Sequence, residues 1–471
     1  MKIFCRLSSI LILTLLVLAC DESDKFSSDS GLRLEYSQDA LRFDTVFTTV
    51  LSPVQRVKVY NRNDNSISIS SIKLMNPETS GFRINVDGQA GTEFQDVDLL
   101  RKDSLYIMVD VKADALNGAS PVIKDAIELS WNGNTEQIQL EAYAIDVDIW
   151  NDKTIDSDTR LTADRGYYIK GKVSVAPNAT LTIEEGTTLY FDQKGSLNIE
   201  GKIIARGTAG KRITFRGHRF DLIERNVPYD NASGQWRGIT IGANSYHNVL
   251  ENVNIRNSGI GIDFVSSSPD RKKATLVNSI VHNTSEYGIK AVNCNIEAMN
   301  CLFSNSAAGV LTLAGGRYSF LHCTIANYYR WHPRTTPCVT LTDIAGQEKY
   351  PLSECDFANS IVAGTFRDEL EMIFTQENNS IQFSNCLIQS SKALDDKRFQ
   401  NTIWNIESVF LFKDLNTEGQ YFYNFELPEG STARDAANID AAQKAPTDLR
   451  GISRFSDSKP DIGCYEWYKD E

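Results

Sequence analysis

The chain has 471 residues, of which 41% are hydrophobic and 23% are charged, and its formal net charge is −13. This balance excludes a disordered chain, and the length favours two domains or an elongated repeat fold over one compact core. The negative charge disfavours nucleic acid as a partner, because like charges repel.

Residues 1–19 have the composition of a signal peptide. Lys2 and Arg6 form a basic start, and a short apolar run ends at Leu18. That run is too short for a comfortable membrane span, so we expect cleavage rather than a transmembrane helix. Cys20 directly after a small residue resembles the lipobox of bacterial lipoproteins. The resemblance implies that Cys20 is acylated and anchors the chain to a membrane; the alternative is plain secretion with an incidental cysteine.

Residues 20–32 are rich in Ser and acidic residues and predict a flexible tether. The run Asp21-Glu22-Ser23-Asp24 resembles the surface-export signals of Bacteroidetes lipoproteins. The resemblance implies an outer-membrane lipoprotein at the cell surface or on the periplasmic face.

Residues 33–147 predict an antiparallel β-sandwich. Apolar residues alternate strictly from Leu105 to Val111, and turn clusters such as Asn132-Gly133-Asn134 separate the runs. A period of two with frequent turns is typical of strands with one buried face. Four segments resemble an immunoglobulin-like module of Bacteroidetes lipoproteins: Phe43–Phe47, Val59–Asn61, Phe82–Gly88 and Trp131–Asn134.

A short pattern then recurs six times: an apolar residue, a spacer, Asn or His, a small residue, any residue and an apolar residue. The copies centre on Asn252, Asn278, Asn300, His322, Asn359 and Asn385, at intervals of 26, 22, 22, 37 and 26 residues. An interval near 22 is what one coil of a stacked solenoid needs. A second landmark, Gly before a β-branched or apolar residue, recurs in phase at Gly238, Gly261, Gly288 and Gly309.

Stacking assigns a place to each position of the pattern. Asn tolerates the left-handed corner conformation, and its amide can bond to the next coil. We expect His322 to be a buried member of this ladder. Cys301, Cys323 and Cys386 then point inward as thiols rather than as metal ligands or disulfides. The column before the corner contains Leu250, Leu276, Ala298, Phe320, Phe357 and Phe383.

This pattern is similar to that of right-handed parallel β-helix proteins. The opening Trp236-Arg237-Gly238-Ile239 and the endings Leu427–Ser431 and Pro460–Glu466 resemble β-helix surface proteins from Bacteroidetes. The resemblance implies a pectate-lyase-like fold over residues 165–467, with a C-terminal cap. The predicted fold class is all-β: an antiparallel β-sandwich followed by a right-handed parallel β-helix solenoid.

The sequence is less specific about chemistry. The sequence lacks the paired Asp on a strand, the Gly-His-Gly and the acidic calcium-binding cluster of pectin-degrading β-helix enzymes, since Asp395-Asp396 lies beyond the last clear repeat. Asp263 and Lys290 each lie two residues after a landmark Gly, between Thr240 and Leu311 in the same predicted column. They are weak catalytic candidates; a surface ion pair between neighbouring coils is the alternative.

The 37-residue interval contains an insertion of aromatic and basic residues. Its candidate ligand-binding residues are Tyr328, Tyr329, Arg330, Trp331 and His332. Long excursions from a solenoid often line its binding face, and aromatic rings stack on sugars. The alternative is an aromatic plug over the coil edge. A second excursion, His218–Gln235, is expected alongside it.

These observations favour a cell-envelope lipoprotein whose β-helix is a non-catalytic binding or structural module, with polysaccharide as the ligand class. The alternative is a polysaccharide lyase or glycoside hydrolase with a diverged site. No metal or other cofactor is predicted.

Overall fold

The computed structural model describes residues 24–224, 227–405, 411–415, 423–457 and 459–469. The signal peptide and Cys20 lie outside the described residues. The chain divides into two compact units, Met1–Asp146 and Val147–Glu471. In the described part of the chain, none of the helices has the length and apolarity required to cross a membrane.

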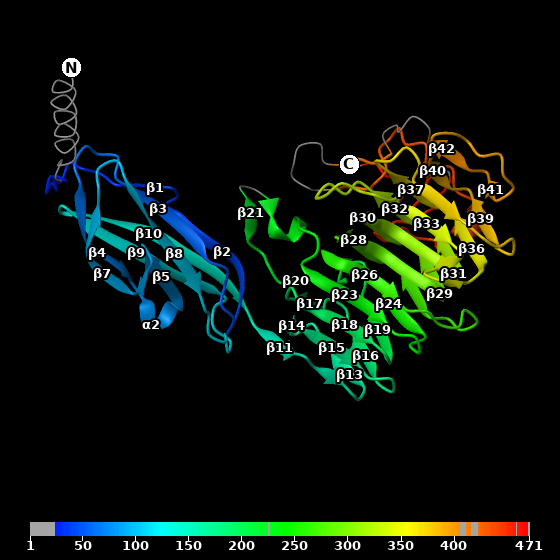
Figure 1. Ribbon diagram of the computed structural model, residues 1–471, viewed down its shortest axis with the longest axis horizontal. Helices are drawn as coiled ribbons and strands as arrows, with labels where there is room; N and C mark the ends of the chain where they lie inside the picture. Colours follow the sequence, from blue (N-terminus) through cyan, green and yellow to red (C-terminus); the bar gives the residue numbers. More distant parts are fainter. Residues whose placement is uncertain (1–23, 225–226, 406–410, 416–422, 458, 470–471) are drawn as a thin grey trace, which may run out of the picture. The chain divides into compact units, whose positions relative to one another are not determined.

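The first unit is a pair of five-stranded sheets around one apolar core (Figure 1). One sheet has the order β1 (Glu35–Tyr36), β3 (Gln55–Tyr60), β8 (Ser104–Val111), β5 (Phe82–Val86) and β6 (Gln89–Gly91). The other has the order β2 (Ala40–Phe47), β10 (Asn134–Ile145), β9 (Val122–Trp131), β4 (Ile67–Leu74) and β7 (Glu93–Leu99). A short helix, α2 (Pro77–Ser80), precedes β5. Neighbouring strands are antiparallel except β2 and β10, so the predicted antiparallel sandwich is confirmed with one parallel pair.

The sequence pattern explains this unit locally. Leu105, Ile107 and Val109 are buried in alternation along β8. Asn132 and Gly133 have φ angles of 45° and 76°, as the tight turn between β9 and β10 requires.

The second unit is a stack of parallel strands with three faces. Face A is an eleven-stranded sheet. Its strands are β11 (Val147–Asn151), β14 (Gly166–Lys170), β17 (Thr188–Phe191), β20 (Ile213–Gly217), β25 (Val253–Arg256), β28 (Ile280–Thr284), β30 (Leu302–Ser306), β32 (Thr324–Asn327), β37 (Ile361–Gly364), β40 (Leu387–Gln389) and β42 (Ile403–Asn405). The parallel pairing begins at β11, so residues 148–164, which the sequence left between its two predicted domains, belong to the stack together with Val147, which was predicted to end the sandwich.

A seventeen-stranded sheet supplies the other two faces. Face B contains β12 (Thr154–Ile155), β15 (Lys172–Val175), β18 (Ser196–Ile199), β23 (Trp236–Ile241), β26 (Ser258–Phe264), β33 (Val339–Thr342), β38 (Leu370–Ile373) and the first halves of β29 (Tyr287–Met299) and β31 (Gly309–Leu321). Face C contains β13 (Thr159–Leu161), β16 (Thr180–Ile183), β19 (Lys202–Arg206), β24 (Asn248–Glu251), β27 (Ala274–Val277), β36 (Leu352–Ala358), β39 (Ile381–Ser384), β41 (Phe399–Gln400) and the second halves of β29 and β31.

The Asn ladder lies at the corner between faces C and A. All six predicted positions have left-handed φ angles, between 49° and 53°. Asn300 donates its amide to Asn278 Oδ1 at 3.1 Å, so the coil-to-coil bonding is also confirmed. Asn401, with a φ of 50°, adds a seventh member that the sequence pattern missed.

His322 replaces one amide of this ladder. Its Nδ1 donates to the carbonyl of Gly463 at 3.3 Å, and its Nε2 accepts from the Asn359 amide at 2.9 Å. The ring is fully buried, and desolvation and the nearby Arg454 hold the pKa of His322 well below 6.5. His322 is therefore a neutral, buried ladder member, as expected.

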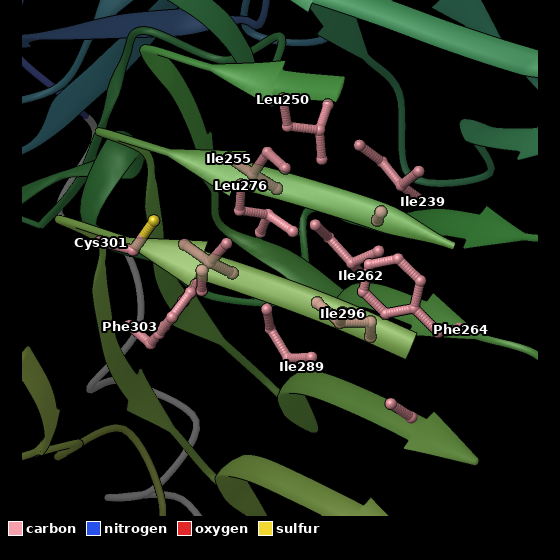
Figure 2. Packing of buried hydrophobic residues seen from close by; sticks show 14 of the residues in the cluster. Ile239, Leu250, Ile255, Ile262, Phe264, Leu276, Ile289, Ile296, Cys301 and Phe303 are labelled. Atoms are coloured by element: carbon pink, nitrogen blue, oxygen red, sulfur yellow. The ribbon is translucent and has the colours of Figure 1, made fainter. Parts of the chain in front are cut away.

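The interior consists of repeated columns. The predicted column before the corner is in register from Leu250 to Phe383, and the rings of Phe320, Phe357 and Phe383 stack with centroids 4.7 Å apart. Figure 2 shows Leu250, Leu276, Cys301 and Phe303 among the apolar side chains gathered inside the coils. The seven described cysteines are all buried and unpaired, which confirms the packing role predicted for three of them.

Residues 425–457 and 459–467, here called the strap, lie against the outside of face A. Leu302, Ile361 and Leu387 from face A share an apolar cluster with Leu427 and Ile462 of the strap. The ladder also binds the strap, since Asn359 Nδ2 donates to the carbonyl of Asn438 at 3.0 Å. The sequence predicted a C-terminal cap here; the contacts place this segment along one side of the stack.

Candidate functional site

A polar column runs along the outside of face B. The strand register aligns Asn198, Thr240, Asp263, Lys290, Thr312, Thr340 and Glu371. Asp263 and Lys290 lie opposite each other on adjacent strands, as the sequence predicted. Leu311 was a wrong prediction, because Gly309 pairs with Tyr287 rather than with Gly288. The residue two positions after Gly309, Leu311, is therefore buried, and the outward position of the column is occupied by Thr312.

Asp263 and Lys290 do not form an ion pair in the described structure, although they lie opposite each other on adjacent strands. Desolvation raises the pKa of Asp263, and Lys290 opposes part of that rise. The next ionisable side chain along the column is Glu371, three coils beyond Lys290. At ~4.8 Å per coil, Glu371 is roughly 14 Å away, too far to act on the same bond. Among the described residues, no group of three His, Cys, Asp or Glu side chains could hold a metal ion.

A cleft of about 560 Å³ opens beside this column, at the corner between faces A and B. Four successive coils contribute to its wall, and the side chains that matter for binding are Lys194, Arg237, Ser285 and Glu286. Gly234 has no side chain to fill this space, and a Cβ at this position would come within 2.8 Å of Ser285 Oγ. Sequence reasoning missed this cleft, because its residues come from corners whose alignment is known only once the register is known.

The cleft presents exposed hydrogen-bonding groups. Lys194, Arg237 and Glu286 are exposed, and among the described residues none of the three forms an ion pair with a protein group. Two cations, a carboxylate and a hydroxyl offer many donors and few apolar contacts. Such a lining suits a ligand with many hydroxyl groups better than an apolar ligand.

The two excursions predicted from the sequence lie side by side. The hydroxyl groups of Tyr329 and Ser233 are 2.8 Å apart, and Ser233 precedes the cleft residue Gly234. Tyr329 is nevertheless buried, and Tyr328 packs against Phe412 and Phe425 in the cluster beneath the strap. These two candidates fit the aromatic-plug alternative.

The remaining insertion residues are closer to solvent. Arg330 and His332 are exposed, and Trp331 is half-buried. The base of the insertion is fixed by Arg334, whose guanidinium donates to both oxygens of Glu369 at 2.9 and 2.7 Å. Both side chains are buried. The long interval is therefore firmly anchored, and only its tip could contact a ligand.

Comparisons with known proteins support the fold of the second unit. A family model described as "Right handed beta helix region" matches residues 166–327. Together with the parallel coils, this match makes the second unit a right-handed parallel β-helix. A search of curated proteins finds no match.

Two solved structures are distantly similar. One is a protein of unknown function from Porphyromonas gingivalis W83, with 13% identity and a TM-score of 0.19 over 26% of this chain and 50% of that one. The other is a family 123 glycoside hydrolase from Clostridium perfringens, with 8% identity and a TM-score of 0.17 over 24% of this chain and 26% of that one. The alignments thus span half of the first protein and about a quarter of the second, and these scores support no inference about function.

Proposed function

We propose that this chain is an outer-membrane lipoprotein whose β-helix binds a polysaccharide without cleaving it. The observation that carries the proposal is the cleft with Lys194, Arg237 and Glu286, which lies beside the polar column of face B. Arg237 and Thr240 lie on the same strand, so one extended ligand could contact both. Coils repeating every ~4.8 Å offer such a ligand successive polar contacts.

A glycan array with the mature chain tests this proposal, followed by titration calorimetry on the strongest ligand. Arg237→Ala removes a charged donor from the cleft and should weaken binding about tenfold. Arg206→Ala is the matched control, because Arg206 is an exposed arginine on face C. An array without hits, or equal losses in the two variants, would contradict the proposed site.

A catalytic role is the second candidate, favoured by the raised pKa of Asp263 next to Lys290. It predicts release of reducing or unsaturated sugars from the bound polysaccharide. If the chain shows such turnover and Lys290→Ala abolishes it, the function of this face is catalysis rather than binding alone.

The envelope location forms part of the same proposal. Acylated Cys20 would anchor the chain to the outer membrane, and the first unit would serve as an immunoglobulin-like spacer. Two five-stranded sheets around the buried Trp131 support that assignment. Cys20→Ser should shift the protein from the membrane fraction to the soluble fraction; unchanged membrane association would rule out the lipid anchor.

A further inference from the structure

The outward face of the β1-β3-β8-β5-β6 sheet carries aromatic and basic side chains. We define the sandwich patch as Arg56, Lys58, Tyr60, Arg62, Tyr106 and Met108. The register places Lys58 opposite Tyr106 and Arg56 opposite Met108, on adjacent strands β3 and β8. Tyr106 is 38% exposed and Met108 45% exposed, so this part of the sheet presents apolar surface to solvent.

The cations of the patch lie close to its rings. Lys58 Nζ is 5.2 Å from the ring centroid of Tyr60 and 5.1 Å from that of Tyr106. Arg56 Cζ is 5.4 Å from the Tyr106 centroid, and Arg62 Cζ is 4.3 Å from that of Tyr60. Such cation–π contacts hold the long side chains against the sheet, so less conformational freedom is lost when a ligand binds.

The patch also carries positive charge that the protein does not neutralise. Arg62 pairs with Glu35 at 3.6 Å, but among the described residues neither Arg56 nor Lys58 has a carboxylate partner. On the opposite sheet, the two lysines have acid partners: Lys73 pairs with Glu128 at 3.1 Å, and Lys124 with Glu141 at 3.9 Å. The patch thus holds two cations without an ion-pair partner beside exposed rings, although the net charge of the chain is −13.

We propose that the sandwich patch binds an anionic polysaccharide, one that carries carboxylate or sulfate groups. Arg56 and Lys58 would pair with its anions, and the tyrosine rings would pack against the apolar faces of its sugars. Charge complementarity excludes a cationic partner. An anionic bilayer fits less well, because a membrane plane repels an acidic protein over a wide area, whereas a single polysaccharide strand meets only the patch.

The test uses the full mature chain and affinity electrophoresis through gels that contain polygalacturonate, with neutral dextran as the uncharged comparison. The double variant Arg56→Gln, Lys58→Gln should weaken polygalacturonate binding about fivefold or more. Lys73→Gln, Lys124→Gln makes the same change of charge on the opposite sheet and should have an effect below about twofold. Binding should also weaken as ionic strength rises.

Further variants separate the parts of the proposal. Tyr106→Thr retains a residue that suits a strand but removes the ring, and should weaken binding to polygalacturonate. Lys58→Arg keeps the charge and should bind like the parent protein; if the double Gln variant does not fold, Lys58→Glu provides the charge test. Arg206→Ala, on face C and outside both the patch and the cleft, should leave this binding unchanged.

The proposal is overturned if the two double variants lose binding equally, if Tyr106→Thr has no effect, or if the chain binds phosphatidylglycerol vesicles but not polygalacturonate.

Discussion

Removing one ring from the interior phenylalanine column tests whether the stacked coils provide the main stabilisation of the β-helix. Phe357 is 1% exposed and lies between Phe320 and Phe383, with ring centroids 4.7 Å away on both sides. Phe357→Ala removes most of a buried side chain, and the neighbouring coils can only partly close the cavity. Burial and packing together predict a loss of about 4 kcal/mol in the free energy of unfolding.

Phe399→Ala is the matched control. Phe399 is half-buried in the last pair of the face C column; its ring stacks on Phe383 at 5.0 Å and makes a tilted contact with Trp404 at 5.0 Å. Its removal should cost less than half as much, because less area is buried. Urea unfolding followed by circular dichroism measures both losses, and the contribution of residues 24–146 cancels between variants. Equal losses, or a loss below about 1.5 kcal/mol for Phe357→Ala, would refute this account of the core.

Three further predictions concern single features of the β-helix. The folded state keeps His322 neutral, whereas the unfolded chain takes up a proton at this residue below pH 6.5. The free energy of unfolding should therefore fall as pH decreases from 6.5 to 5, by at most about 2 kcal/mol from this residue. In urea titrations at both pH values, His322→Asn should reduce this pH dependence, and an unaltered dependence contradicts the assignment. Gly238→Ala places a Cβ 1.7 Å from the Ile260 carbonyl at a φ of 115° and should lower the melting temperature strongly, whereas Gly210→Ala, with open space around it, should change it little. Tyr329→Phe should cost about 0.5–1.5 kcal/mol through the lost bond to Ser233, and a double-mutant cycle with Ser233→Ala that shows no coupling would argue against that bond.

The repeat could be predicted from the sequence because each coil places equivalent residues in equivalent surroundings. Asn252 and Asn278 have the same φ, 50°, and the column from Leu250 to Phe383 follows from spacing alone. The sequence wrongly placed Leu311 in the outward column because the register of Gly309 differs by one residue from that of the preceding landmark glycine, Gly288.

The site was less predictable, because it depends on contacts between residues distant in the sequence. Glu369 lies 35 residues after Arg334, and no pattern in the sequence connects them. The cleft combines Lys194 with Glu286, so its walls meet only after the intervening coils have stacked. The aromatic composition of the insertion suggested sugar binding, but Tyr328 packs into an apolar cluster and Tyr329 is buried.

The strap has a consequence for how the chain folds during synthesis. Its contacts join very distant residues: Cys464 N donates to Thr324 Oγ1 across 140 positions, and Arg212 Nη2 donates to the Leu449 carbonyl across 237. Contacts of such separation form slowly, and the strap follows the coils in the chain, so it is synthesised after them. Until then, the outward apolar residues Leu302, Ile361 and Leu387 of face A have no cover. A nascent or truncated chain that lacks the strap therefore exposes an aggregation-prone sheet, and needs a chaperone or rapid completion to remain dispersed.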